Sequence, residues 1–124
     1  MNFAETFVRI QIKPLRLIPS PSVDLVLIDD DPLVRATWEV RAKFQGVSVK
    51  CLESAAQLPL EGVTFDTPIY IDKMLGDFDG VDVARDLWRK GFKNLYLATG
   101  FPLKDRDIAG FSFLKGITGK EFPV

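Results

Sequence analysis

The sequence contains no histidine and only one cysteine, Cys51, among its 124 residues. Without histidine, the chain cannot supply Ser-His or Cys-His catalysis, imidazole acid–base chemistry or a His-ligated metal site. A single cysteine excludes a disulfide within the chain, which fits a reducing compartment, and we expect a cytoplasmic protein. We interpret Cys51 as a small core residue rather than a reactive thiol. Any chemistry must therefore rest on carboxylates, lysine, threonine and hard cations.

A charge excess and long apolar runs are missing as well. The chain has 16 basic and 17 acidic residues, and no cluster of lysine and arginine offers an electrostatic basis for direct nucleic-acid binding. No apolar run reaches the length of a membrane span, and the N-terminus lacks the pattern of a signal peptide. With 47% hydrophobic and 27% charged residues, the composition indicates one globular domain that binds neither nucleic acid nor a membrane.

Five segments are predicted as strands. Residues 23–28, 68–71 and 95–98 are short apolar runs that end in polar or turn residues, which is typical of buried parallel strands. Residues 47–51 alternate apolar and polar side chains and predict a half-buried strand near an edge. Residues 111–115 are expected to form the fifth strand.

Helices are predicted between these strands. One begins at Pro32 with Asp31 as its N-cap and ends at Gly46. The side chains expected on its inward face are Leu33, Ala36, Thr37, Val40 and Phe44.

A second helix follows Gly80, and a short one is expected from Ser54 until Pro59 interrupts it. The inward face predicted for the second helix consists of Val83, Ala84, Leu87 and Trp88. The β-α-β alternation predicts an α/β doubly wound parallel sheet with right-handed crossovers. About ten residues separate Thr99 from the fifth strand, so the fourth helix must be short, and too few residues follow for a fifth helix.

The first 22 residues do not fit this alternation. Residues 8–13 alternate apolar and polar side chains, a strand period, and residues 19–22 (PSPS) read as a linker. We therefore interpret residues 1–22 as an N-terminal extension or linker that offers an extra strand, and residues 23–124 as the domain.

Three carboxylates follow inner strands directly. Asp29 and Asp30 follow residues 23–28, and Asp72 follows residues 68–71. The carboxyl ends of parallel strands share one edge of the sheet, which is where such folds place ligands. Two carboxylates about 5 Å apart repel by roughly 3 kcal/mol at an effective dielectric near 20, so the cluster must hold a proton or a cation. An all-oxygen site suits Mg²⁺, although for Asp29 and Asp30 alone a solvated acidic loop that caps the helix explains the pattern equally well.

Asp72 is our candidate nucleophile for a phosphoryl group. Thr99 and Lys115 are each expected to end a strand at the same edge. A carboxylate that attacks phosphorus needs its own charge and the phosphoryl oxygens neutralised. Mg²⁺ and the Lys115 ammonium would do this, and the Thr99 hydroxyl would hydrogen-bond a phosphoryl oxygen.

The chain resembles the receiver domains of bacterial response regulators over about residues 23 to 118. The resemblance is carried by residues 26–32 (VLIDDDP), 71–74 (IDKM) with Asp79-Gly80, 97–100 (LATG) and 113–115 (FLK). It implies a flavodoxin-like, five-stranded parallel sheet in the order 2-1-3-4-5.

The same resemblance implies the roles of the site residues. Asp72 would be the phosphoacceptor, and Asp29, Asp30 and the Met74 backbone carbonyl would bind Mg²⁺ with it. Thr99 would sense the phosphoryl group and Lys115 would pair with it. The partner would be a histidine kinase or a histidine phosphotransfer protein.

Several positions depart from the family pattern. Gly76 and Gly116 stand where receivers usually carry proline, and Ser112 stands where they carry an aromatic residue. The missing fifth helix would leave apolar sheet surface open, which folded monomers rarely do. We expect residues 7–18, an upstream domain or a second copy to cover the face around Phe111 and Phe113.

These patterns leave two functions open. The first is a phosphoacceptor receiver in a two-component phosphorelay, which catalyses only its own phosphorylation and dephosphorylation and is a signalling switch rather than an enzyme. The second is a pseudo-receiver that docks proteins without phosphorylation. A carboxylate-nucleophile phosphatase is disfavoured, because it would need a second carboxylate two residues after Asp72, where Met74 stands.

Overall fold

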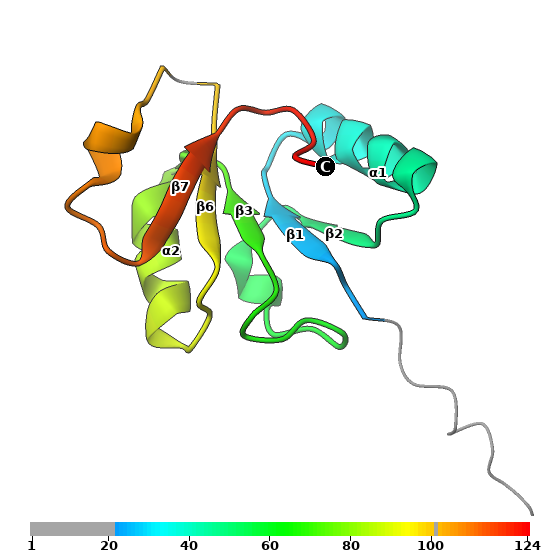
Figure 1. Ribbon diagram of the computed structural model, residues 1–124, viewed down its shortest axis with the longest axis horizontal. Coiled ribbons are helices and arrows are strands. Elements are labelled where there is room, and N and C mark those ends of the chain that lie inside the picture. Colours follow the sequence, from blue (N-terminus) through cyan, green and yellow to red (C-terminus); the bar gives the residue numbers. More distant parts are fainter. Residues whose placement is uncertain (1–21, 101) are drawn as a thin grey trace, which may run out of the picture.

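The computed structural model describes residues 22–100 and 102–124, and these form one parallel sheet with helices on both faces (Figure 1). The five strands run in the order β2-β1-β3-β6-β7, which by count is 2-1-3-4-5, and every neighbouring pair is parallel. Their bounds are β1 Leu25–Ile28, β2 Val49–Leu52, β3 Ile69–Ile71, β6 Leu95–Ala98 and β7 Leu114–Thr118. The predicted fold class, a doubly wound flavodoxin-like sheet, is confirmed.

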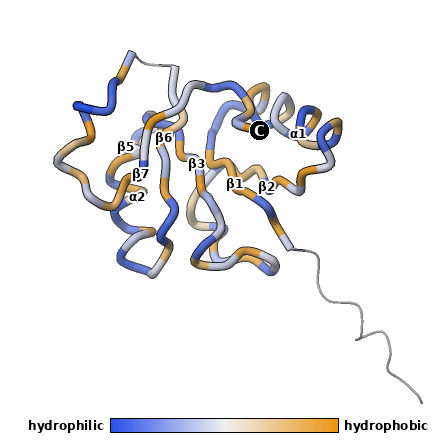
Figure 2. The backbone as a smooth tube through the Cα atoms, in the orientation of Figure 1, coloured by the Kyte–Doolittle hydropathy of each residue, from blue (hydrophilic) through white to orange (hydrophobic). Residues whose placement is uncertain are grey.

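The core lies on both faces of the three inner strands. β1 consists of four buried apolar residues, and it appears as a continuous hydrophobic stretch in Figure 2. Val26 and Ile28 belong to the core under α2 (Gly80–Arg89), whereas Leu25 and Leu27 pack toward α1 (Pro32–Gln45). This division follows from the period of two in a strand, which sends successive side chains to opposite faces.

The described residues contain two α-helices and two 3₁₀ turns. The 3₁₀ turn η2 (Ala55–Gln57) is capped by Ser54, where the short helix is predicted to begin. The 3₁₀ turn η3 (Asp105–Ile108) stands in place of the fourth helix. No helix follows β7 in residues 119–124, and this tail instead crosses back to α1 (Figure 1). A two-stranded hairpin that we did not predict, β4 (Met74–Leu75) with β5 (Phe78–Asp79), turns at Gly76, whose φ is +61°.

Helix α1 begins and ends where the sequence predicts. The Asp31 side chain accepts a hydrogen bond from the Leu33 N–H at 2.9 Å, and Gly46 closes the helix in the left-handed region at φ +68°. The predicted inward face is wrong, because the buried residues are Trp38 and Ala42. The predicted inward side chains Leu33, Val40 and Phe44 are 73%, 53% and 83% exposed.

Helix α2 is closer to its prediction. Asp79 caps it by accepting from the Val81 N–H at 2.8 Å, and Val81, Ala84 and Leu87 are buried. Trp88 was expected to face inward but is half exposed, with its ring 6.3 Å from the ring of Phe113.

The last strand lies three residues later than predicted. Leu114 pairs with Leu95, and an irregularity in the register then brings Gly116 opposite Tyr96, so β7 continues to Thr118. Phe111 and Phe113 precede the strand and pack against the core under α2. The expectation that residues 111–115 form this strand is therefore wrong.

The predictions for the N-terminal segment fall outside the described residues. These are the extra strand at residues 8–13 and the covering of the face around Phe111 and Phe113 by residues 7–18. Among residues 22–100 and 102–124, no helix is long and apolar enough to cross a membrane.

Candidate functional site

Three carboxylates converge at the carboxyl edge of the sheet. Ile28 pairs with Ile71 across β1 and β3, so the residues that follow these two, Asp29 and Asp72, emerge side by side. Oxygens of Asp29, Asp30 and Asp72 all lie within 4.8 Å of one another. The Asp29 side chain is fully buried and Asp72 is nearly so, whereas Asp30 is exposed. The fold thus creates the charge cluster that the sequence predicts at this edge.

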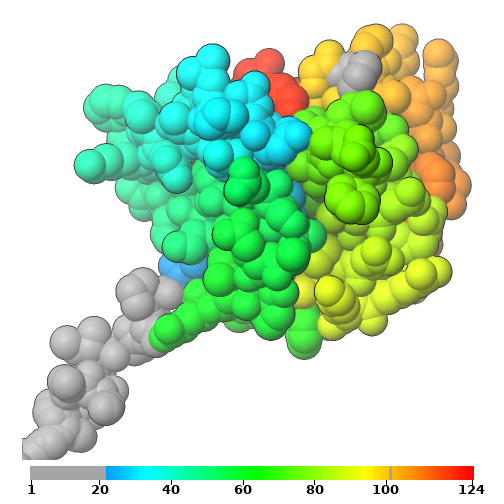
Figure 3. Space-filling model, turned by 180° about the vertical axis from the view of Figure 1, so that it is seen from behind, coloured from blue at the N-terminus to red at the C-terminus, as the bar shows by residue number. Residues whose placement is uncertain are grey.

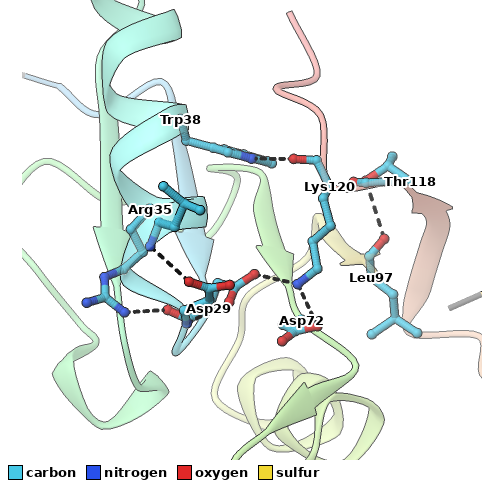
Figure 4. A network of polar contacts seen from close by, with 10 residues as sticks. Asp29, Arg35, Trp38, Asp72, Leu97, Thr118 and Lys120 are labelled. Carbon is cyan, nitrogen blue, oxygen red and sulfur yellow. Dashed lines mark hydrogen bonds and ion pairs between the residues drawn. The ribbon is translucent and has the colours of Figure 1, made fainter. Parts of the chain in front are cut away.

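A lysine that the sequence analysis missed pairs with two of these carboxylates. Lys120 Nζ lies 2.5 Å from Asp29 Oδ2 and 2.8 Å from Asp72 Oδ1 (Figure 4). Burial alone would lower the pKa of Lys120, but its hydrogen bonds to the two carboxylates raise that pKa above the usual value. Lys120 therefore stays protonated and acts as a fixed cation between Asp29 and Asp72.

Lys115 does not reach this site. It is the second residue of β7 and is exposed near the amino end of that strand, whereas the carboxylates lie at the carboxyl ends. The expectation that Lys115 ends the last strand beside Asp72 is wrong because the strand begins later than its apolar pattern suggests. Lys120 is the residue that follows the strand's actual end at Thr118 by two positions.

The C-terminal tail is anchored on α1, and this anchoring places Lys120. The Trp38 indole Nε1–H donates to the Lys120 backbone carbonyl at 2.8 Å (Figure 4). The ring of Phe122 meets the Trp38 ring edge-on at 5.3 Å. Farther along, Gln45 Nε2 donates to the Val124 carbonyl at 2.7 Å. Trp38 is fully buried, so its position is fixed by the core. Helix α1, which connects β1 to β2, thus holds the tail segment that carries Lys120.

Replacing Trp38 with phenylalanine should remove the indole donor while keeping an aromatic ring in the core. We expect the free energy of unfolding to fall by about 1–3 kcal/mol, because one hydrogen bond and part of the ring are lost. Urea denaturation measures this loss. Trp88→Phe is the matched control on the half-exposed helix face and should change stability by less than about 0.5 kcal/mol. Equal losses in both variants would contradict a specific anchoring role for Trp38.

The loop after β1 holds Asp29 in place. Arg35 Nη1 donates to the Asp29 backbone carbonyl at 2.9 Å, and the Asp31 N–H donates to Asp29 Oδ1 at 2.9 Å. Asp31 caps α1, as predicted, and belongs to the helix rather than to the cluster. Each Asp29 side-chain oxygen therefore has a partner, which a buried carboxylate requires.

A pocket of about 350 Å³ opens beside the cluster. It is lined by Asp72, Met74, Thr99, Gly100 and Lys120. The Thr99 N–H donates to the Thr118 carbonyl at 3.0 Å, so the ends of β6 and β7 are joined next to this pocket. The structure thus brings together every predicted site residue except Lys115.

The residues of the cluster fit a magnesium ion. All side-chain donors are carboxylate oxygens, the ligands that Mg²⁺ prefers, and Lys120 offsets one of their three charges. Asp29, Asp30 and Asp72 are the side chains that would hold the ion.

Asp79 and Lys73 form an ion pair next to this site. Lys73 Nζ lies 2.8 Å from Asp79 Oδ2. Burial tends to raise the pKa of Asp79, but hydrogen bonds from Lys73 and from the Val81 N–H outweigh it, and the pKa is lowered from the usual 3.8. The Asp79 carboxylate is therefore ionised at neutral pH, and its negative charge stabilises the N-terminus of α2.

Acid should weaken this cap in a defined pH range. Because the pKa of Asp79 is lower in the folded state, its contribution to stability is complete above pH 3.8 and disappears as the pH falls through the folded value. We expect Asp79→Asn to be less stable than the wild type at neutral pH and the difference to shrink below pH 3.8. Urea midpoints measured between neutral and acid pH check this, and a difference that does not change with pH would contradict it.

Cys51 lies outside this site. Burial raises the pKa of its thiol to about 12, so it is not a nucleophile at neutral pH.

The fold is similar to that of solved structures. The receiver domain of the TMAO respiratory system response regulator TorR is similar to this chain with a TM-score of 0.63 and 23% sequence identity, over 84% of this chain and 86% of that one. The chain has a receiver-domain fold. No protein-family model and no curated protein matches it.

The receiver-domain fold explains why the cluster lies where it does. In this doubly wound sheet β1 and β3 are neighbours, and the chain crosses to opposite faces after each of them. Open α/β sheets bind their ligands at the carboxyl ends of the strands where such a reversal occurs. The fold alone does not fix the function, which has to be argued from the side chains at that edge.

Proposed function

We propose that this chain is a phosphoacceptor receiver, in which Asp72 takes a phosphoryl group from a phosphohistidine. The observation that carries the proposal is the position of Asp72, nearly buried and 2.8 Å from Lys120 Nζ, within the carboxylate cluster and open to the pocket. The sequence has no histidine, so the donor histidine lies outside these 124 residues. That partner is a histidine kinase or a histidine phosphotransfer protein.

The side chains at the carboxyl edge of the sheet have different roles in this phosphoryl transfer. An Asp72 carboxylate oxygen attacks phosphorus, the phosphorus–nitrogen bond breaks, and an acyl phosphate forms while the released imidazole takes up a proton. The Lys120 ammonium neutralises charge on the phosphoryl oxygens, and the Thr99 hydroxyl donates a hydrogen bond to one of them. The three carboxylates and the Met74 carbonyl would hold Mg²⁺, which would supply further positive charge next to these oxygens.

This activity makes the chain a switch rather than an enzyme acting on a separate substrate. It catalyses only its own phosphorylation and dephosphorylation. The negative charge of the attached phosphoryl group alters its contacts with partners. We place it in the cytoplasm, with residues 23–124 as the receiver domain and residues 1–22 as an extension. The sheet face without a helix after β7 remains our candidate contact for an upstream domain or a second copy.

Intact mass after incubation with Mg²⁺ and acetyl phosphate tests the proposal. We expect one added phosphoryl group on the wild-type chain and complete loss of it in Asp72→Asn or without Mg²⁺. Asp66→Asn, in an exposed loop, is the matched control and should be labelled like the wild type. Labelling that survives Asp72→Asn would contradict the assignment of the acceptor.

The pseudo-receiver is the second candidate, and one observation favours it. Lys120 already pairs with both Asp29 and Asp72, so these two buried carboxylates share a cationic partner without a metal or a phosphoryl group. The same experiment separates the two functions. A chain with neither an adduct nor Mg²⁺ binding would be a docking module.

A further inference from the structure

A groove of about 380 Å³ lies between α2 and the segment that joins β2 to β3. Its apolar lining includes Ala55, Leu75, Val83 and Leu87, and Phe78 at the groove is 70% exposed. Figure 3 shows this face: the β2–β3 connection is green, and the β4–β5 hairpin and α2 next to it are yellow-green. The connection contributes only the 3₁₀ turn η2, so none of the described helices covers the groove. An apolar groove with an exposed aromatic ring is typical of a binding surface.

The groove is acidic around its apolar lining. Asp30, Glu53 and Asp86 line it together with one cation, Lys90. An occupant that matches this surface carries large apolar side chains and several positive charges, because electrostatic complementarity favours such a partner over a neutral or acidic one.

Residues 7–18 of the chain have this chemistry. The segment reads FVRIQIKPLRLI and contains seven large apolar side chains, the three cations Arg9, Lys13 and Arg16, and no acidic residue. The described chain begins beside the β2–β3 connection, whose first residues line the groove, because the Val23 N–H donates to the carbonyl of Gly62 in this connection at 2.9 Å. An extended chain spans roughly 3.4 Å per residue, so the residues before Val23 can reach the groove.

We propose that residues 7–18 dock in this groove rather than on the face around Phe111 and Phe113, with their apolar side chains against its lining and their cations facing the carboxylates. The inference does not depend on phosphoryl transfer. Asp30 belongs both to the groove and to the acidic cluster, so a docked cation opposes divalent-cation binding there, and the two binding events are coupled in both directions.

Charge reversal in the segment tests the docking by NMR on the ¹⁵N-labelled full chain, without Mg²⁺. Combined Arg9→Glu, Lys13→Glu and Arg16→Glu should shift the amide resonances of residues 54–56 and 75–76, because the segment leaves the groove. Thermal denaturation of each variant shows that the domain still folds.

A matched control changes the net charge by the same amount elsewhere. Combined Arg41→Glu, Lys43→Glu and Lys50→Glu alters exposed positions on α1 and β2. These substitutions should leave the groove resonances unchanged, because none of the three lines the groove.

A compensating variant makes the test specific. Glu53→Lys with Asp86→Lys turns the groove basic and should restore the wild-type shifts of residues 75–76 when combined with the reversed segment. Shift differences that persist on dilution show docking within one chain, and differences that vanish on dilution show docking in a second copy; both support residues 7–18 as the occupant. Groove resonances that are the same in the wild type and the reversed segment would overturn the proposal, whether or not another protein binds there.

Discussion

Replacing Lys120 with methionine is expected to lower the free energy of unfolding by roughly 3 kcal/mol in the absence of a divalent cation. Lys120 Nζ is the cation shared by Asp29, which is fully buried, and Asp72, which is nearly buried. Without it, two close carboxylates lose their common partner and repel each other. The lysine side chain is itself 32% exposed, so we expect the loss at the lower end of the range for a broken buried ion pair.

Denaturation by urea with and without Mg²⁺ measures this effect. Mg²⁺ should recover part of the lost stability, because a ligand that binds only the folded state stabilises it and the lysine no longer competes for the carboxylates. Lys115→Met is the matched control, because Lys115 is exposed on β7, and it should change stability by less than about 0.5 kcal/mol. After incubation with acetyl phosphate, Lys120→Met should take up less phosphoryl group than the wild type, and Lys115→Met should take up as much. A larger loss from Lys115→Met would show that the structural assignment of the cation is wrong.

This pair of lysines shows why the site could be predicted only in part. The convergence of Asp29, Asp30 and Asp72 follows from local features, because two apolar runs end in carboxylates and parallel strands end at one edge. The position of Lys120 depends instead on the register between β6 and β7, whose irregularity lies between Leu95 and Tyr96. Strand pairing of this kind is set by distant contacts, which a local pattern does not contain.

The same limit explains the wrong face of α1. The caps of this helix were predictable, since Asp31 and Gly46 act through their own backbone and side-chain chemistry. Its sequence, however, contains two apolar stripes. One includes Trp38 and Ala42, and the other includes the exposed residues Leu33, Val40 and Phe44. Periodicity alone cannot choose between two such stripes. The choice is made by Tyr70 and by the returning tail with Phe122, both of which contact Trp38.

Gly80→Ala should disturb Asp72, the proposed phosphoacceptor, through a direct backbone clash. A Cβ built at Gly80 would lie 2.1 Å from the Asp72 carbonyl oxygen and 2.9 Å from the Lys73 Cα, both backbone atoms. The Gly80 N–H also donates to the Lys73 carbonyl at 2.7 Å, so the helix start and the Asp72 segment are held in direct contact. Because backbone cannot rotate away as a side chain can, either the start of α2 or Asp72 has to move.

We expect Gly80→Ala to lose about 3 kcal/mol of stability or more and to take up little phosphoryl group from acetyl phosphate. An alanine within a helix would by itself gain up to about 1 kcal/mol over glycine, so the observed loss underestimates the steric cost. Gly110→Ala is the control, because a Cβ there meets no atom within 4 Å, and it should be nearly neutral in both measurements. If Gly80→Ala matched this control, the backbone of Asp72 would not be set by its contact with α2. A stable variant that loses only labelling would instead show that the strain is relieved by moving Asp72 out of the cluster.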